Sequence, residues 1–418
     1  MTYPTNEPGP DATTPAPAPA EPGPEKPVAA DDDRWRRALR EIASGNAAVA
    51  FFSVLLAVLV GSLLIMFTDD DVRDSFSYVF ARPGDFFSAS WNAVWGAYTA
   101  LFRGSIYNTR VDDFQTAIRP LTETFKFAAP LIVAGLGVGL AFRAALFNIG
   151  GRGQMLMAGA AAGWVGYQFE MPWPIHVTLA ILVGMAAGAL WGGLVGLLKA
   201  RTGAHEVIVT IMLNYVAFYL VFYALSEQNL LQAPGSANPK SLPMKESVVL
   251  PKLFGDRYNL HLGFLLALIA VAVVWWILNR SSLGFRIRAV GENPAAARSA
   301  GIDVGRTYIV VMLISGGLVG LAGVNQVLGT VTSGITVDLD ASIGFDAITV
   351  ALLGRSRPLG ILAAGLLFGA FKAGGFAMQA SENIPVDIVL VVQSLIVLFI
   401  AAPPLIRAIF RLPTREAQ

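Results

Sequence analysis

The stretch LGFRIRAVGENPAAARSAGIDVGR, residues 283–306, lies between two long apolar segments and decides how the rest of the chain is interpreted. Asn293 is a favoured helix N-cap, Pro294 suits the first helical position, and Gly301 can end the alanine-rich helix between them in a left-handed cap. A two-turn helix is therefore predicted inside an arginine-rich loop between two membrane spans. An ordinary positive loop would explain the arginines but not a capped, nearly uncharged helix, so the pattern favours a docking element.

The composition around this insert is that of a polytopic membrane protein. Of 418 residues, 55% are hydrophobic and only 14% are charged, and the mean hydropathy is +0.58. The net charge of +1 gives no reason to expect a nucleic-acid partner. The absence of cysteine excludes disulfides, thiolate metal sites and cysteine nucleophiles. No metal site is predicted, because His176, His205 and His261 lack any ligand spacing.

Ten apolar runs predict an all-α membrane protein with about ten transmembrane helices. The runs lie near 47–68, 127–147, 155–169, 175–199, 207–226, 262–279, 307–328, 342–354, 358–378 and 385–402. The runs 155–169 and 342–354 are shorter than the ~20 residues of an upright span, so one or both are expected to be tilted, broken or re-entrant. Whether they cross fully stays open.

The termini and the loops predict the orientation. Residues 1–33 hold nine prolines among small and acidic residues, which predicts a disordered cytoplasmic tail before a transmembrane domain at 34–411 and a short cytoplasmic tail at 412–418. Four arginines between 34 and 40 favour a retained first span over a signal peptide. Alternation of the runs then places the basic residues of the short loops in or beside the cytoplasm, namely Arg143, Arg152, Lys199, Arg201, those of the 280–306 loop, Arg355, Arg357, Arg407 and Arg411. The short outer loops near 170–173, 330–342 and 379–385 carry no lysine or arginine, as the positive-inside rule requires.

Glycine is placed for close packing of helices. The motifs GMAAG at 184–188 and GGLVG at 192–196 and 316–320 each put small residues four apart on one helix face. Contact between helices explains them better than contact with a substrate. GGLVGL occurs at both Gly192 and Gly316, which is a weak sign of internal duplication.

The chain shows no energy-coupling or catalytic machinery of its own. It has no GxxxxGK[ST] phosphate loop, and no carboxylate pair or Ser-His-Asp arrangement predicts a catalytic residue. Asp346 and Lys372 are the main ionisable groups within the runs, and a cap role explains Asp346 at least as well as a functional one. The energy for any transport is expected to come from a partner.

Four stretches resemble the permease subunits of ATP-binding-cassette (ABC) importers, in the branch that carries nucleosides and simple sugars within the branched-chain amino acid and ribose-type permease superfamily. The stretches are 140–159, 202–220, 283–323 and 344–370, within a similarity that spans roughly 120–405. FNIGGRGQ at 147–154 and HEVIVTIMLNY at 205–215 are more similar to the nucleoside permeases than to the ribose-type ones. The resemblance implies a type II-like importer of about ten spans, in which the insert is the coupling helix that seats in a cleft of the ATPase.

The resemblance also implies the partners. A separate ABC ATPase would hold ATP and Mg²⁺, so no cofactor is expected on this chain. A second permease, either a related chain or another copy, would complete the pore, and an extracytoplasmic substrate-binding lipoprotein would deliver a nucleoside or a sugar.

Polar side chains in the spans are candidates for the substrate path, because a nucleoside carries no fixed charge and several donors and acceptors. They are Asn148, Gln154, Thr210, Asn214, Tyr215, Asn325, Gln326 and Gln393. The pairs Asn214–Tyr215 and Asn325–Gln326 come first, since clustered polar groups in an apolar helix are costly unless they face a cavity or a neighbour. Interhelical hydrogen bonding explains each of them equally well.

The candidates for ATPase coupling are the residues of the predicted helix and its flanks. They are Gly291, Glu292, Asn293, Pro294, Ala295, Ala296, Ala297 and Gly301. Glu292 near the helix start suits the helix dipole and could pair with an arginine of the ATPase, although capping alone would also account for it.

Two other classes of membrane protein and one long segment stay open. An ion-coupled carrier would need more charge within the spans, and a membrane-embedded enzyme would need convergent catalytic groups. Within the permease class, simple sugars are the nearest alternative substrate and branched-chain amino acids a more distant one. The aromatic-rich outer segment 69–126 could hold an amphipathic helix that serves as a lid, an interfacial anchor or a contact for a binding protein.

Overall fold

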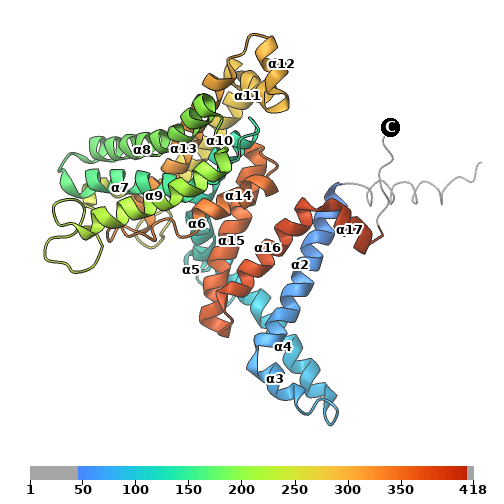
Figure 1. The fold of residues 1–418 in the computed structure, drawn as a ribbon. Coiled ribbons are helices and arrows are strands. Elements are labelled where there is room, and N and C mark those ends of the chain that lie inside the picture. Colours follow the sequence, from blue (N-terminus) through green and yellow to red (C-terminus); the bar gives the residue numbers. More distant parts are fainter. Residues whose placement is uncertain (1–45, 412–418) are drawn as a thin grey trace, which may run out of the picture.

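The computed structural model describes residues 46–411, and the predictions for the two tails and for the arginines between 34 and 40 lie outside the described residues. Within that range the chain is helical, and a single isolated β-bridge joins Lys252 to His261 (Figure 1). The elements are α2 Asn46–Thr68, α3 Asp70–Phe76, α4 Pro83–Ser105, α5 Phe114–Ala117, α6 Arg119–Phe142, α7 Gly151–Gln168, α8 Trp173–Thr202, α9 Glu206–Ser226, the 3₁₀ turn η1 Glu246–Val248, α10 Gly263–Arg280, α11 Ser282–Glu292, α12 Pro294–Ser299, α13 Val304–Asn325, the π-helical turn η2 Gln326–Thr330, α14 Ile343–Leu353, α15 Pro358–Glu382, α16 Val386–Ala401 and α17 Pro403–Ile409.

Each of the ten predicted apolar runs falls on a helix, which confirms the all-α polytopic fold. The runs correspond in order to α2, α6, α7, α8, α9, α10, α13, α14, α15 and α16. Seven helical stretches of the described chain are long and apolar enough to cross a membrane. Helices α14 and α16 are shorter apolar helices, and the 18-residue α7 is not among the seven. The chain is therefore a multi-pass membrane protein, and its short elements need a separate explanation.

Helices α6 and α13 form the centre of the protein, and α8 packs along α13. Residues 128–141 of α6 are all buried, because other helices surround this part of it. Helices α8 and α13 cross at their glycines: a Cβ atom on Gly188 would lie 2.6 Å from the carbonyl oxygen of Gly316, and one on Gly192 would lie 2.6 Å from that of Met312. The prediction that these glycine motifs serve helix packing is confirmed, since two backbones can approach this closely only where both lack side chains.

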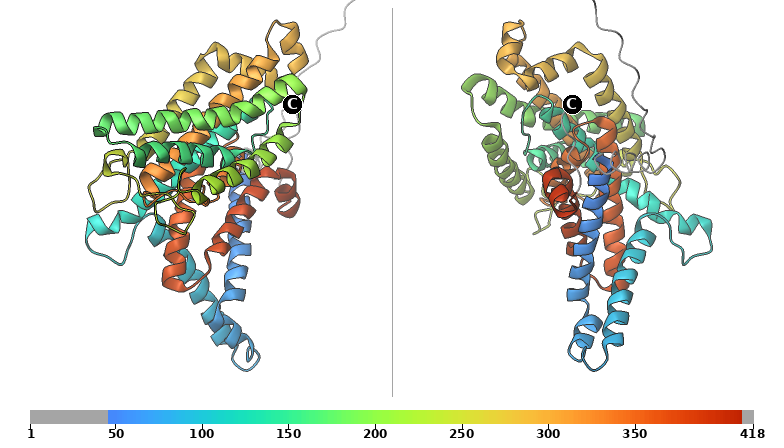
Figure 2. Two further views of the ribbon diagram at one scale, coloured as in Figure 1. Left: turned by 60° about the vertical axis from the view of Figure 1, so that its left-hand side comes forward. Right: turned by 90° about the vertical axis from the view of Figure 1, so that its right-hand side faces the viewer.

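A hairpin of α2, α3 and α4 extends from the rest of the molecule at the end opposite α12 (Figures 1 and 2). Helix α2 packs against α16, where a Cβ atom on Gly61 would meet the side chain of Val392. Helix α4 packs along α15, with Gly104 facing Gly374, and the hydroxyl of Tyr98 donates to the carbonyl oxygen of Val58 at 2.8 Å. The long segment 69–126 therefore supplies a helix of the bundle, although Phe87, Trp91 and Trp95 of α4 remain exposed.

Helices α7 and α14 begin inside the bundle rather than at its surface. The side chain of Gln154, in the first turn of α7, faces Gly192 of α8, ten residues before α8 ends at Thr202, which places this turn about 15 Å from that end. The start of α14 lies against the start of α7, because a Cβ atom on Gly151 would be 2.6 Å from the carbonyl oxygen of Gly344. The segments that precede α7 and α14 are therefore non-helical backbone that lies inside the bundle rather than at its end.

This arrangement corrects the predicted positions of Arg152 and of the loop 330–342. Arg152 was expected beside the cytoplasm and the loop on the outer side, yet Arg152 Nε lies 3.3 Å from Asp340 Oδ1. The physical reason is that the non-helical segments 143–150 and 331–342 lead to the first turns of α7 and α14, which lie against each other, so that Arg152 meets the buried Asp340.

Candidate functional site

A cavity of about 460 Å³ opens beside the first turn of α14, and we call it the central cavity. Its wall combines Phe127 of α6, Gln326 of η2, the first two turns of α14, and side chains of α15 and α16. The lining residues are Phe127, Gln326, Ala341, Ser342, Ile343, Asp346, Thr349, Phe371, Lys372, Phe376, Val386, Val389, Leu390, Gln393 and Ser394. A volume of this size suits a small organic ligand.

The backbone at the start of α14 is strained where it borders the cavity. Ala341 and Ser342 both have left-handed φ angles, 44° and 64°, although neither is a glycine. Such conformations cost about 1–3 kcal/mol each and persist only where the surrounding structure imposes them. Here the contact between Gly151 and Gly344 and the Arg152–Asp340 ion pair hold this backbone from its other side.

Charged and amide groups converge on the central cavity. Lys372 Nζ lies 2.8 Å from Asp346 Oδ2 and also donates to the carbonyl oxygen of Ala341 at 3.3 Å. Gln326 Nε2 donates to the carbonyl oxygen of Leu339 at 3.4 Å. Gln393 is 4% exposed, and its Oε1 has no hydrogen-bond partner among the described residues. An unsatisfied buried acceptor costs about 1–3 kcal/mol, so a donor supplied by a ligand would be favoured at this point.

Aromatic rings complete the wall of the cavity. The centroids of Phe127 and Phe376 are 5.7 Å apart with an interplanar angle of 37°, and Phe371 lies on the same helix as Phe376. The cavity thus pairs apolar ring faces with a carboxylate, an ammonium and two carboxamides. Opposite charges within it are paired, which suits a ligand without net charge.

Of the eight predicted path residues, Gln326 and Gln393 lie in the central cavity, and three others form a separate buried cluster. Asn148 Nδ2 donates to Gln154 Oε1 at 3.1 Å and to Ser315 Oγ at 2.8 Å. Asn214 Oδ1 accepts from the amide of Gly153 at 2.8 Å, and its Nδ2 donates to the carbonyl oxygen of Ile149 at 2.9 Å. These bonds hold the non-helical segment before α7 against α9 and α13.

The remaining predicted residues take three different positions. Thr210 donates to the carbonyl oxygen of Glu206 within its own helix, and Tyr215 is 59% exposed on the outside of α9. Asn325 is 2% exposed, and neither its Oδ1 nor its Nδ2 has a hydrogen-bond partner among the described residues. Only one member of each expected pair therefore lies in the buried cluster or in the central cavity. The two members separate because neighbouring residues on a helix point about 100° apart.

Sequence reasoning did not assign Asp346, Lys372 or the three phenylalanines to the path. Lys372 carried a usable signal, since it is the single basic residue in the apolar helix 358–382 and such a charge requires a partner. Asp346 was the other ionisable group singled out, and the ion pair joins the two. The phenylalanines gave no signal, because phenylalanine in an apolar helix is ordinary.

Helix α12 forms as predicted, at the end of α13 that lies away from the central cavity. Asn293 Oδ1 accepts from the amides of Ala295 at 3.0 Å and Ala296 at 3.1 Å, Pro294 is the first helical residue, and Gly301 has a φ of 81°. The two-turn helix and its caps are confirmed. The arginine-rich part before it is not a loop as expected, because residues 282–292 form the amphipathic helix α11.

The predicted coupling residues divide into a packed and an exposed set. Ala297 packs with Val290 and Val304 in a small apolar cluster, and Gly291 lies against the backbone of Arg143. The exposed residues of the set are Glu292, Asn293, Pro294, Ala295, Ala296 and Gly301. The exposed face is small and nearly uncharged, which fits a surface that docks into a cleft.

Positive charge gathers around this end of the molecule. Arg143, Arg288 and Arg357 line a common pocket beside α11. Burial and then the neighbouring charges of Arg357 and Arg288 lower the pKa of the Arg143 guanidinium from its usual value. The clustering agrees with the orientation expected from the positive-inside rule.

Comparisons with known proteins fit this geometry. Residues 121–401 match the family described as "branched-chain amino acid transport system / permease component". The chain is 36% identical over 363 residues to the guanosine ABC transporter permease protein NupP of Bacillus subtilis, covering 86% of this chain and 94% of that protein. It is 34% identical to the nucleoside ABC transporter permease protein NupB of Lactococcus lactis, over 74% and 84% of the two chains. It is 33% identical to the glucose ABC transporter permease protein TsgB13 of Haloferax volcanii, over 67% and 75%.

Proposed function

Because the chain belongs to the family of permease components of branched-chain amino acid transport systems, we propose that it forms the translocation path of an ABC importer for nucleosides. It lies in the cell membrane as a multi-pass protein, and the ATP-hydrolysing step belongs to a separate subunit that holds ATP and Mg²⁺. A second permease completes the pore, and an extracytoplasmic binding lipoprotein delivers the substrate. The guanosine and nucleoside permeases among its relatives support this assignment.

The central cavity is the observation that carries the substrate class. Phe127 and Phe376 can stack against a nucleobase, while the amide of Gln393 can bond its edge. The carboxylate of Asp346 can accept from ribose hydroxyls, and Lys372 keeps that carboxylate neutralised at 2.8 Å. The paired charges disfavour a substrate with a net charge, which would leave one buried charge without compensation.

A simple sugar is the alternative substrate, and the glucose permease among the relatives favours it. A sugar would use the same carboxylate and amides but has no flat aromatic ring to stack. The three phenylalanines in the lining therefore favour the nucleoside.

Helices α12 and α13 supply the coupling route. Helix α12 docks in the ATPase, and α13 leads from it to the π-helical turn that carries Gln326 into the cavity. Helix α13 is locked to α8 by the close backbone contact at Gly188 and Gly316, so displacement of α12 moves α13 and α8 together. Alternating access follows when closure of the ATPase dimer shifts this unit relative to α15 and α16.

The test is uptake by the complete transporter in proteoliposomes. The chain is co-expressed with its ATPase, second permease and binding protein, and labelled guanosine, uridine, ribose and glucose are supplied one at a time with ATP. ATP-dependent accumulation of nucleosides at least tenfold above both sugars supports the proposal. Preferential accumulation of a sugar would replace the substrate class, and gradient-driven uptake without ATP would replace the transporter class.

A further inference from the structure

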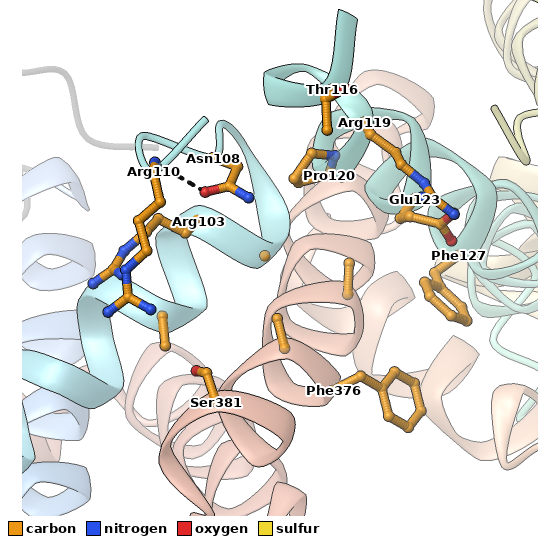
Figure 3. Close-up of a pocket in the computed structure, with 14 residues that line it drawn as sticks. Arg103, Asn108, Arg110, Thr116, Arg119, Pro120, Glu123, Phe127, Phe376 and Ser381 are labelled. Atoms are coloured by element: carbon orange, nitrogen blue, oxygen red, sulfur yellow. Dashed lines mark hydrogen bonds between the residues drawn. The ribbon is translucent and has the colours of Figure 1, made fainter. Parts of the chain in front are cut away.

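A second pocket, of about 530 Å³, lies at the end of the molecule opposite α12, between α4, α6 and α15, and we call it the distal pocket (Figure 3). Arg103 and Arg110 border it from α4 and the segment that follows, and Arg119 and Glu123 border it from α6. Figure 3 shows these polar side chains around the pocket, with the rings of two phenylalanines at the lower right of the view.

The two phenylalanines are Phe127 and Phe376, which also line the central cavity. No other residue belongs to both linings, so the two spaces meet at this pair of rings. The distal pocket and the central cavity therefore follow one another along α6 and α15, and two facing side chains separate them.

The two rings differ in how firmly they are held. Lys126 Nζ lies 4.5 Å above the centroid of the Phe127 ring, and Lys126 also forms an ion pair with Glu123. Glu123 in turn accepts from Asn259 Nδ2 at 2.6 Å. Phe376 is 54% exposed, and its only ring contact among the described aromatic side chains is Phe127. One ring is thus anchored, whereas the other can change its rotamer with little loss of packing.

We propose that the distal pocket is the entrance to the transport path and that Phe376, closing against the anchored ring of Phe127, is the gate between the entrance and the central cavity. The inference rests on the proposed function for the identity of the substrate, a nucleoside. The same ring faces that close the gate can stack on a passing base, and the guanidinium groups of Arg103 and Arg119 can donate to its carbonyl oxygens.

The absence of cysteine from this chain makes the gate testable by thiol labelling. Thr349→Cys places a thiol in the central cavity, and Ser381→Cys places one in the distal pocket. Each variant is expressed as the full transporter in sealed right-side-out vesicles and exposed to a membrane-impermeant, positively charged methanethiosulfonate reagent. Rates are compared with native Phe376, with Phe376→Ala and with Phe376→Trp.

The gate predicts opposite changes for the two replacements. Labelling of Thr349→Cys should be at least tenfold slower than that of Ser381→Cys, should rise at least tenfold with Phe376→Ala, and should fall with Phe376→Trp. Labelling of Ser381→Cys should stay within twofold throughout. Phe345→Ala is the matched control, because Phe345 is 48% exposed on α14 and lines neither space.

Equal labelling of the two thiols with native Phe376, or a rate at Thr349→Cys that ignores both replacements, would overturn the gate. If Phe376→Ala fails to assemble, Phe376→Trp alone decides, since a gate requires slower labelling in that variant. Protection of Thr349→Cys by guanosine but not by ribose would support the nucleoside. If the Phe376 variants change the labelling rate of Thr349→Cys but guanosine does not protect this thiol, the gate is supported and the proposed substrate is contradicted.

Discussion

Helix α12 and the central cavity lie at the two ends of α13, and they are held in opposite ways. Helix α12 depends on bonds within a few residues: one side-chain oxygen of Asn293 caps two amides, and Gly301 ends the helix. The central cavity depends on contacts between residues far apart in sequence, such as Gly151 with Gly344 and Asp346 with Lys372.

The difference indicates a division of labour. Under the proposed function, α12 keeps its shape while its exposed face binds the ATPase, and its local caps supply that shape together with the packing of Ala297 against Val290 and Val304. A transport cavity must change shape when the surrounding helices move, and walls drawn from α6, α14, α15 and α16 allow this. Damage to long-range contacts should therefore have larger effects than damage to the cap.

The largest effect is expected for Gly151→Leu. The Cβ of the added side chain would lie 2.6 Å from the carbonyl oxygen of Gly344, where no rotamer relieves the clash. The free energy of unfolding should therefore fall by about 3 kcal/mol. Assembled transporter should be lost in gel filtration of the solubilised complex. Gly84→Leu is the control, because a Cβ atom there meets no atom within 4 Å. Normal assembly of the Gly151 variant would show that the two short helices are not held by this contact.

A smaller but still large effect is expected for the ion pair of the cavity. Asp346→Asn or Lys372→Met alone leaves one charge without its partner. Each should lower the free energy of unfolding by on the order of 2 kcal/mol and should lower nucleoside uptake at least tenfold. The double variant should regain thermal stability but not uptake, because the carboxylate is still missing. Recovery of full uptake by the double variant would mean that the pair serves structure alone.

A moderate effect is expected for Asn293→Ala. Removal of the cap should destabilise α12 by about 1 kcal/mol and lower transport-coupled ATP hydrolysis several-fold, while the rest of the fold is unaffected. Asn293→Asp should restore activity, since its carboxylate can accept from the same two amides. If Asn293→Ala and Asn293→Asp impair hydrolysis equally, the amide contacts the ATPase directly rather than through the cap.

The smallest effect concerns His261, which lies against Gly329 and Thr330 of η2. Burial, and then the charge of Lys126, lowers the pKa of His261 from 6.5 to about 4. The unfolded protein then binds more protons than the folded one between these values, so stability should fall as the pH drops from 6.5 towards 4. Thermal unfolding of the complex across this range should show the slope.

The control for this dependence is His261→Gln, which should flatten the slope because it removes the titrating ring. The amide of Gly263 donates to Nδ1 at 3.2 Å, and a glutamine oxygen can replace that acceptor. An unchanged slope in the variant would assign the pH dependence to other groups.

The same contrast between local and long-range contacts explains how much of the fold could be predicted from the sequence. The apolar runs and the cap of α12 are local patterns, so the positions of the ten helices and the role of Asn293 followed from sequence. The depth at which α7 and α14 begin depends on which helices lie beside them, and alternation of runs carries no such information. Arg152 was therefore predicted in or beside the cytoplasm, although it pairs with Asp340.

The candidate site was predictable only in part. Gln326 and Gln393 were predicted as polar groups that need a partner or a cavity, and both line the central cavity. Asn148 and Asn214 have the same chemistry, but Asn148 bonds the side chains of Gln154 and Ser315, and Asn214 bonds the backbone of Ile149 and Gly153. Tertiary packing, and not the residue type, decides whether such a polar side chain lines a cavity or bonds another part of the protein.

The most direct test of the account is co-purification of the ATPase with tagged chain from mild detergent, for the wild type and for Ala296→Asp. Ala296 is exposed on α12, so the substitution adds charge without disturbing the packing of Ala297, and Thr202→Asp adds the same charge at the exposed end of α8 as a control. The account predicts that an active ATPase accompanies the wild type and Thr202→Asp and is lost or uncoupled from uptake with Ala296→Asp. Full ATPase recovery and normal uptake with Ala296→Asp would contradict the claim that α12 is the docking helix.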